Sequence, residues 1–200
     1  MKRLIALFAG ILAILPVFPS SAVTLPTTVI TFVPIAKTTY GSSDIELTVS
    51  ASAGVTTITS NSPSVCIMSS ANTVRVVGAG ICKLVATNPG TVSYKPARAV
   101  NRSFSVAKAT NTITISDFDS LSMANPDASI STTQSSGITF LSSTTTKYCT
   151  INGNVVHAIK VGKCTIRATN SGDSNYYAAK SVTKSVTIGL TSPVPPPDVS

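Results

Sequence analysis

Tryptophan is absent from this sequence, and histidine occurs once, at His157. Aromatic residues make up only 6% of the chain. Sugar-binding β-sandwiches usually present flat aromatic platforms, so the lack of Trp disfavours a carbohydrate-binding site of the usual kind. A single His, with no cysteine pair at metal-ligand spacing, likewise disfavours a zinc site. The sequence predicts neither a metal nor a cofactor.

Charged residues are also scarce, at 11% of the chain where about a quarter is usual. Ser and Thr take their place beside many Val and Ile residues, a mixture that suits strands better than exposed helix faces. The formal net charge is +8, but the basic residues are scattered, with no run and no interleaved aromatics. Nucleic acid is therefore not an expected partner.

Recognisable catalytic groups are missing too. The chain has no Gly-x-Ser-x-Gly elbow, and no pair of carboxylates recurs in both of its halves. His157 alternates with apolar neighbours and is expected on a solvated strand face. Asp117-Phe118-Asp119 resembles part of a calcium loop but lacks the further ligands at fixed spacing, and is interpreted as a turn. We expect a protein that is not an enzyme.

Residues 1–22 have the features of a cleaved signal peptide. Basic Lys2 and Arg3 precede an apolar run, and small residues close the segment at Ser20-Ser21-Ala22. The alternative is a retained membrane anchor, but the apolar run is short and is broken by Pro16. No later segment is apolar enough to span a membrane. The expected location is extracellular, either secreted or associated with the cell surface.

The remaining sequence repeats itself. "AGICKLVATNPGTVSYKPAR" at 79–98 matches "VGKCTIRATNSGDSNYYAAK" at 161–180. Cys66 matches Cys149 at an offset of 83 positions, and after one deleted residue Cys82 matches Cys164 at 82. A period of this length corresponds to one small domain rather than a solenoid repeat. We expect two domains, at 26–108 and 109–189, followed by a Pro-rich tail at 190–200.

Each half alternates apolar and polar residues over runs punctuated by Gly, Pro, Asn and Ser. In "NTVRVVGAG", Val74 and Val76 should face the core and Arg75 the solvent. About seven such runs per half, without helical periodicity, predict a small antiparallel β-sandwich. In the first half they lie near 29–32, 46–51, 56–60, 65–69, 73–77, 81–86 and 102–107.

The pattern resembles the immunoglobulin-like repeats of bacterial secreted and cell-surface proteins over about residues 26–189. The most telling stretch is "GKCTIRATNSGDSNYYAAKSVTKSVTI" at 162–188. The first half departs from it at Pro89 and Pro96, which predicts a reshaped loop after Cys82. The resemblance implies two tandem immunoglobulin-like β-sandwiches in an all-β chain. Such repeats usually serve as spacers, stalks or adhesive modules.

The four cysteines of an exported chain are expected to pair, in one of three connectivities. The repeat favours Cys66 with Cys82 and Cys149 with Cys164, one bridge per half. The alternatives are free thiols or a metal site, and the spacing disfavours the metal site. Each bridge would close a loop of roughly 15 residues, worth about 3 kcal/mol.

Three tyrosines are candidate contact residues. Tyr94 and Tyr176 match in the repeat and are expected to pack or hydrogen-bond within their own halves. Tyr177, with Lys95 in its place in the first half, should be the exposed aromatic. The end loops at 88–94 and 170–177 would form the contact surface.

The halves are joined by "VAKATNTITI" without a Pro or Gly linker, which favours a semi-rigid rod. The sequence predicts a non-enzymatic protein with a structural or adhesive role, whose partner is a cell-surface protein or polysaccharide. The alternative is an extracellular carbohydrate-binding module. An enzyme, or an inhibitor of one, is a third and weaker hypothesis.

Overall fold

The structure is a computed structural model that describes residues 24–117 and 120–191. The predicted signal peptide and Phe118-Asp119 lie outside the described residues, as does the tail from 192 onward. The described residues form strands and connecting segments, and none of them is helical. No helix in this part of the chain is therefore long and apolar enough to cross a membrane.

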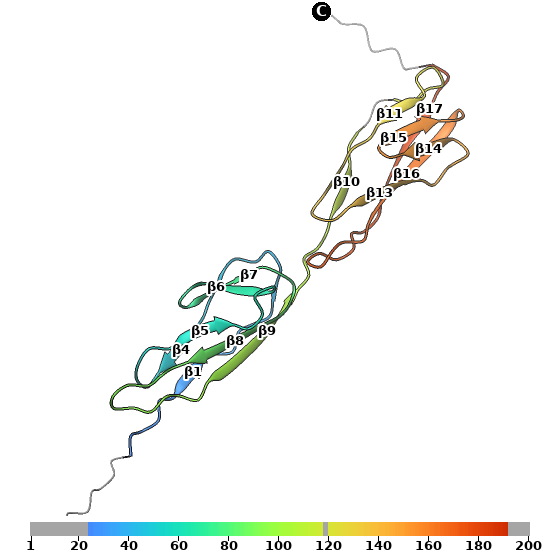
Figure 1. Cartoon of the computed structure of the whole chain (residues 1–200). Coiled ribbons are helices and arrows are strands. Elements are labelled where there is room, and N and C mark those ends of the chain that lie inside the picture. The colour runs from blue at the N-terminus through green and yellow to red at the C-terminus, as the bar shows by residue number, and fades with distance from the viewer. Residues whose placement is uncertain (1–23, 118–119, 192–200) are drawn as a thin grey trace, which may run out of the picture.

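The first half contains nine strands (Figure 1). They are β1 (Ile30–Phe32), β2 (Thr38–Thr39), β3 (Ile45–Glu46), β4 (Val49–Ala51), β5 (Thr57–Ser60), β6 (Cys66–Ser70), β7 (Thr73–Val76), β8 (Gly80–Thr87) and β9 (Val100–Ala107).

Eight further strands form the second half. They are β10 (Ile113–Ile115), β11 (Asp127–Ser129), β12 (Thr132–Gln134), β13 (Thr139–Ser143), β14 (Cys149–Asn152), β15 (Val155–Ala158), β16 (Gly162–Asn170) and β17 (Val182–Ile188).

The two halves share their topology apart from β2, whose place in the second half is taken by a single parallel bridge between Ser122 and Gly189. In the first, β2-β9-β8-β5 form one sheet and β3-β7-β6 another, while β4 continues β3 and pairs with β1. In the second, β13-β16-β17 correspond to β5-β8-β9, β11-β15-β14 to β3-β7-β6, and β10-β12 to β1-β4. Every named pair is antiparallel except β2 with β9. This arrangement of two sheets around a core is an immunoglobulin-like β-sandwich, and the predicted all-β sandwich fold is confirmed.

Alternation along the strands builds the core, as the sequence predicts. In β7, Val74 and Val76 are buried and Arg75 is exposed. The buried residues form two separate clusters, one per half. The first contains Phe32, Leu84 and Phe104, and the second contains Leu121, Ile166 and Ile188. The proposed boundaries at 26–108 and 109–189 remain predictions.

Two details of the strands differ from expectation. The strand predicted at 46–51 is divided into β3 and β4, because the chain exchanges one partner strand for another at Leu47-Thr48. The two-residue strand β2 was not predicted, since so short a parallel pairing leaves no period-two pattern.

The single deleted residue of the repeat has a structural cause. Strand β6 carries a bulge between Met68 and Ser70 that β14 lacks.

Candidate contact surface

One disulfide joins the two sheets of each half. The structure bonds Cys66 to Cys82 and Cys149 to Cys164, the pairing that the repeat predicts. In the second half each sulfur-bearing strand belongs to a different sheet, β14 or β16. The bridges therefore fix the separation of the sheets that carry the end loops.

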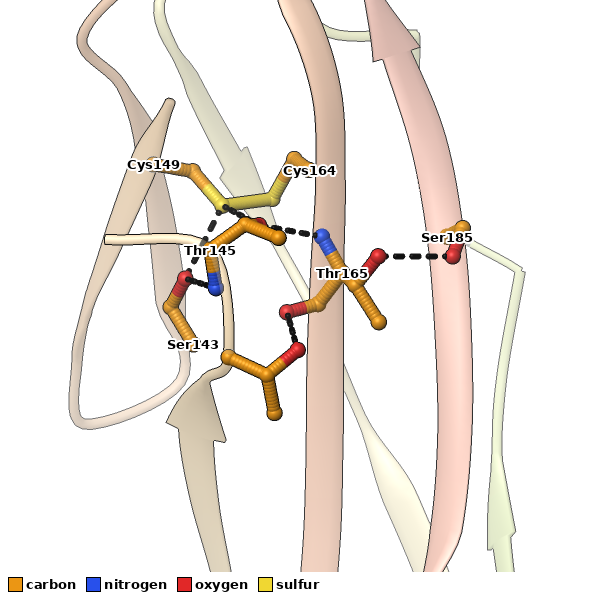
Figure 2. The surroundings of a disulfide bond; sticks show 7 residues. Ser143, Thr145, Cys149, Cys164, Thr165 and Ser185 are labelled. Atoms are coloured by element: carbon orange, nitrogen blue, oxygen red, sulfur yellow. Dashed lines mark hydrogen bonds between the residues drawn. A yellow bond between two sulfur atoms is a disulfide. The ribbon is translucent and has the colours of Figure 1, made fainter. Parts of the chain in front are cut away.

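Hydroxyl groups lie beside each bridge, and Figure 2 shows those beside Cys149 and Cys164. Ser143 Oγ lies 3.3 Å from Cys149 Sγ, and Thr145 Oγ1 accepts the amide hydrogen of Thr165 at 2.8 Å. Ser60 and Ser62 take these places in the first half, where Ser62 Oγ accepts the amide hydrogen of Lys83 at 2.8 Å. Thr and Ser at these positions hold a connecting loop against the neighbouring strand.

A buried asparagine anchors each end loop. Asn88 Nδ2 donates to Ala53 O at 2.9 Å, and Asn88 Oδ1 accepts from Gly90 N at 2.8 Å. Asn170 repeats both bonds, to Ser136 O at 2.8 Å and from Gly172 N at 2.7 Å. The matching "ATN" of the repeat is thus a structural anchor that ties two loops at one end of each sandwich.

The glycine two residues later is required by the backbone. Gly90 and Gly172 have φ angles of 79° and 72°, in the left-handed region. A Cβ on either would lie 2.4 Å from the carbonyl oxygen of Tyr94 or Tyr176. Both loops then form the same turn, so the reshaping predicted for the first loop from its prolines is wrong.

Sequence reasoning missed one member of this network. Asn111, which is buried, donates from Nδ2 to Asn170 Oδ1 and to Ser136 O, both at 3.1 Å. Thr28 occupies the corresponding place in the first half, and its buried hydroxyl has no hydrogen-bond partner among the described residues. Aligning β1 with β10 could have found this pair, because each residue lies two positions before its strand.

The loop at 170–177 faces the first half. Asn175 Oδ1 accepts the amide hydrogen of Ala79 at 2.9 Å, and Lys108 Nζ donates to Asp173 O at 2.6 Å. Tyr177 N donates to Ala109 O at 2.9 Å. These residues form the joint between the halves, which lie end to end in Figure 1.

Tyr176 belongs to this joint. Its ring meets that of Tyr40 edge-on, with centroids 5.6 Å apart and an interplanar angle of 77°. The sequence predicted that Tyr176 packs or hydrogen-bonds within its own half. Its amide does donate to Asp173 Oδ1 there, but its ring packs across the joint. Strand alternation could not show this contact, because it depends on how the two sandwiches meet.

The other two candidate tyrosines are not brought together with Tyr176 in one surface. Tyr94 is half-buried. Its loop at 88–95 connects β8 to β9 and lies at the end of the first half remote from the joint (Figure 1). Tyr177 is 56% exposed, which agrees with the expectation that it is an exposed aromatic. The predicted surface is thus divided between the joint and a free end.

A second matched feature lies on the β3-β7 and β11-β15 pairs. Arg75 Nε donates to Asp44 Oδ1 at 3.1 Å, and His157 Nδ1 lies 2.7 Å from Asp127 Oδ1. The hydrogen bond from Arg75 lowers the pKa of Asp44. His157 is exposed, as predicted, and makes an interstrand contact.

Among residues 24–117 and 120–191, no three His, Cys, Asp or Glu side chains come together as metal ligands would. A hollow of about 260 Å³ lies beside Lys83, Asn101 and Arg102. Arg102 Nε already donates to Phe32 O at 2.7 Å, so the guanidinium in this hollow is engaged by the backbone.

No protein-family model matches the chain, and no curated protein matches it. Domains 1–6 of the surface layer protein SbsC are similar to it at 15% identity and a TM-score of 0.35, covering 74% of this chain and 24% of that one. Domains 4 and 5 of SbsC give 13% identity and 0.35, covering 82% and 98%. Drosophila N-cadherin EC1-4 gives 11% identity and 0.31, covering 82% and 51%.

This chain thus spans about a quarter of the length of the first of these structures. With identities and TM-scores this low, the chain's own strand pairing is the evidence for its fold.

Proposed function

We propose that this chain is a secreted or surface-associated, non-enzymatic protein with a structural or adhesive role. The observation that carries the proposal is the joint, in which the loop at 170–177 meets the first half directly. Asn175, Tyr176 and Lys108 make side-chain contacts across it. A linker that held the halves independently would need none of these contacts.

Two further features support this role. Disulfides persist in oxidising environments outside the cytosol, and each half has one. The exposed strand positions carry mostly Ser and Thr, which give a polar surface of low charge. A stiff, disulfide-bridged rod would hold its ends apart at a cell surface, and a surface protein or polysaccharide is the partner we propose.

Co-sedimentation tests the proposal. The oxidised chain from Val23 would be mixed with intact producer cells and, separately, with stripped wall polymer. We expect it to pellet with intact cells. Recovery of all the protein in both supernatants would contradict an adhesive role at the producer's own surface.

A carbohydrate-binding module is the second candidate, and one observation favours it. Phe140 on β13 is 63% exposed and lies opposite Thr169 on the outer face of the β13-β16-β17 sheet. Thr165 and Ser185 extend this face with a hydroxyl–hydroxyl contact of 2.9 Å. An aromatic ring beside hydroxyl groups can stack on a sugar ring and hydrogen-bond its edge.

A glycan array separates the two candidates. Binding to a polysaccharide that is lost in Phe140→Ala or Tyr177→Ala would favour the module. Tyr94→Ala serves as the matched control, because its ring lies at the remote end of the first half. An array without any bound glycan would count against this candidate and leave the structural role in place.

A further inference from the structure

The end surface that the first half presents at the joint occurs a second time in the molecule. At the joint it consists of Tyr40, Gly78-Ala79 and Lys108, which contact or lie beside the loop at 170–177. The repeat offsets place Met123, Lys160-Val161 and Leu190 at the corresponding positions of the second half. The segment between β15 and β16 and the end of β17, which carry or adjoin these residues, lie at the end of the second half that faces away from the joint (Figure 1).

Backbone hydrogen bonds show that the correspondence is structural. Tyr40 N donates to Ala107 O at 2.9 Å, and Met123 N donates to Gly189 O at 2.9 Å. In the adjoining turn, two successive amides donate to one carbonyl in each half: Val65 O accepts in the first and Tyr148 O in the second. The two end surfaces therefore have the same framework and differ in side chains.

Four side chains at the far end are apolar and exposed, and Lys160 lies between two of them. We call the following four residues the C-terminal end patch: Met123 (40% exposed), Ile159 (46%), Val161 (42%) and Leu190 (73%). At the joint the counterpart of Leu190 is Lys108, which bonds to a backbone carbonyl. Exposed apolar residues gathered at one place commonly mark an interaction surface.

The opposite end of the molecule carries the matching loop. The loop at 88–95 is the counterpart of the joint loop at 170–177 and has the same anchor and turn. Its tip is Val92, which is 97% exposed and takes the place of Ser174. Thr91 takes the place of Asp173, the residue whose carbonyl accepts from Lys108 at the joint.

At two matched positions the free ends are more apolar than the joint, whereas Lys160 replaces Gly78 and Lys95 replaces Tyr177. Where the joint has Lys108 facing the backbone of a loop that contains Asp173 and Ser174, the free ends have Leu190 and a loop tipped by Val92. An apolar loop tip such as Val92 on the C-terminal end patch would bury both apolar surfaces from water.

We propose that the C-terminal end patch of one copy binds the loop at 88–95 of a second copy, head to tail. The contact would repeat the geometry of the joint between two chains. It leaves one free end of each kind, so further copies can add and the assembly is an open filament rather than a closed dimer. A contact between domain ends is small, so the association is weak and grows with local concentration. The inference rests on the joint and does not require the proposed function.

Sedimentation velocity of the untagged, oxidised chain from Val23 tests this inference. We expect the weight-average sedimentation coefficient to rise with concentration and to pass the value of a dimer. Val92→Asp removes the apolar loop tip and Val161→Asp disrupts the patch, so each variant alone should remain monomeric. Ile67→Asp is the matched control, because Ile67 is 39% exposed on β6 and belongs neither to the C-terminal end patch nor to the loop at 88–95. This variant should assemble as the unmodified chain does.

A mixture of Val92→Asp and Val161→Asp gives the most decisive test of the head-to-tail contact. Val92→Asp retains an intact patch and Val161→Asp an intact loop, so an equimolar mixture should form a dimer that grows no further. Unchanged thermal unfolding, followed by circular dichroism, verifies that each variant is folded. A chain that stays monomeric from micromolar to millimolar concentration would overturn the proposal, as would assembly that persists in both variants or a mixture that gives no dimer.

Discussion

At the scale of the residue, two buried asparagines each hold two loops together. Asn88 and Asn170 each donate a hydrogen bond to a carbonyl oxygen of a neighbouring loop and accept one from the amide two residues later in their own loop. Asn88→Ala should lower the free energy of unfolding of the first half by about 1–3 kcal/mol, because it leaves buried backbone groups without partners. Urea unfolding followed by NMR signals from each half measures this. Asn101→Ala, at an exposed strand position, is the control and should change stability little.

Asp173 makes the joint loop sensitive to acid. Hydrogen bonds from Ser136 Oγ and from the amides of Asn175 and Tyr176 lower its pKa below the ordinary value of 3.8. Its contribution to loop order is therefore complete above pH 3.8 and is lost as the pH falls through the lowered pKa. The amide shifts of Asn175 and Tyr176 should titrate in that range, and in Asp173→Asn they should not.

At the scale of the element, the disulfide between Cys149 and Cys164 links β14 to β16 and so joins the two sheets of the second half. Replacing both cysteines by Ser should destabilise that half by about 3 kcal/mol in the chain-entropy model, since the bridge closes a separation of 15 residues. Differential scanning calorimetry should show one transition moved to lower temperature. Equal loss in both halves would contradict the independence of the two cores.

At the scale of the whole molecule, the joint decides whether the chain is a rod or two loosely linked sandwiches. Interfaces this small usually permit domain motion, so its few contacts matter. Replacing Asn175 and Tyr176 by Ala should broaden the distribution of distances between spin labels placed on the two halves. Tyr94→Ala, the same position in the first half, is the matched control. An unchanged distribution in the double variant would show that the linker alone orients the halves.

Much of the fold could be predicted from the sequence, because its causes are local or periodic. The alternation around Arg75 and His157 reports which face of a strand is buried. The repeat indicates the same sandwich twice and favours Cys66 with Cys82 among the three possible connectivities, the pairing that the structure shows. The bulge near Ser69 also leaves a trace in the sequence, as a change of one in the repeat offset.

The surroundings of the tyrosines depended on tertiary structure. Tyr94 and Tyr176 are equivalent in sequence, yet one lies at a free end and the other packs on Tyr40. Only the meeting of the two sandwiches distinguishes them, and no periodicity within a strand carries that information. The sequence by itself determined the sandwich fold, most of the strands and the favoured disulfide pairing. The end-to-end contact of the halves decided which loop forms the joint and which remains free, because that contact joins residues far apart in the chain.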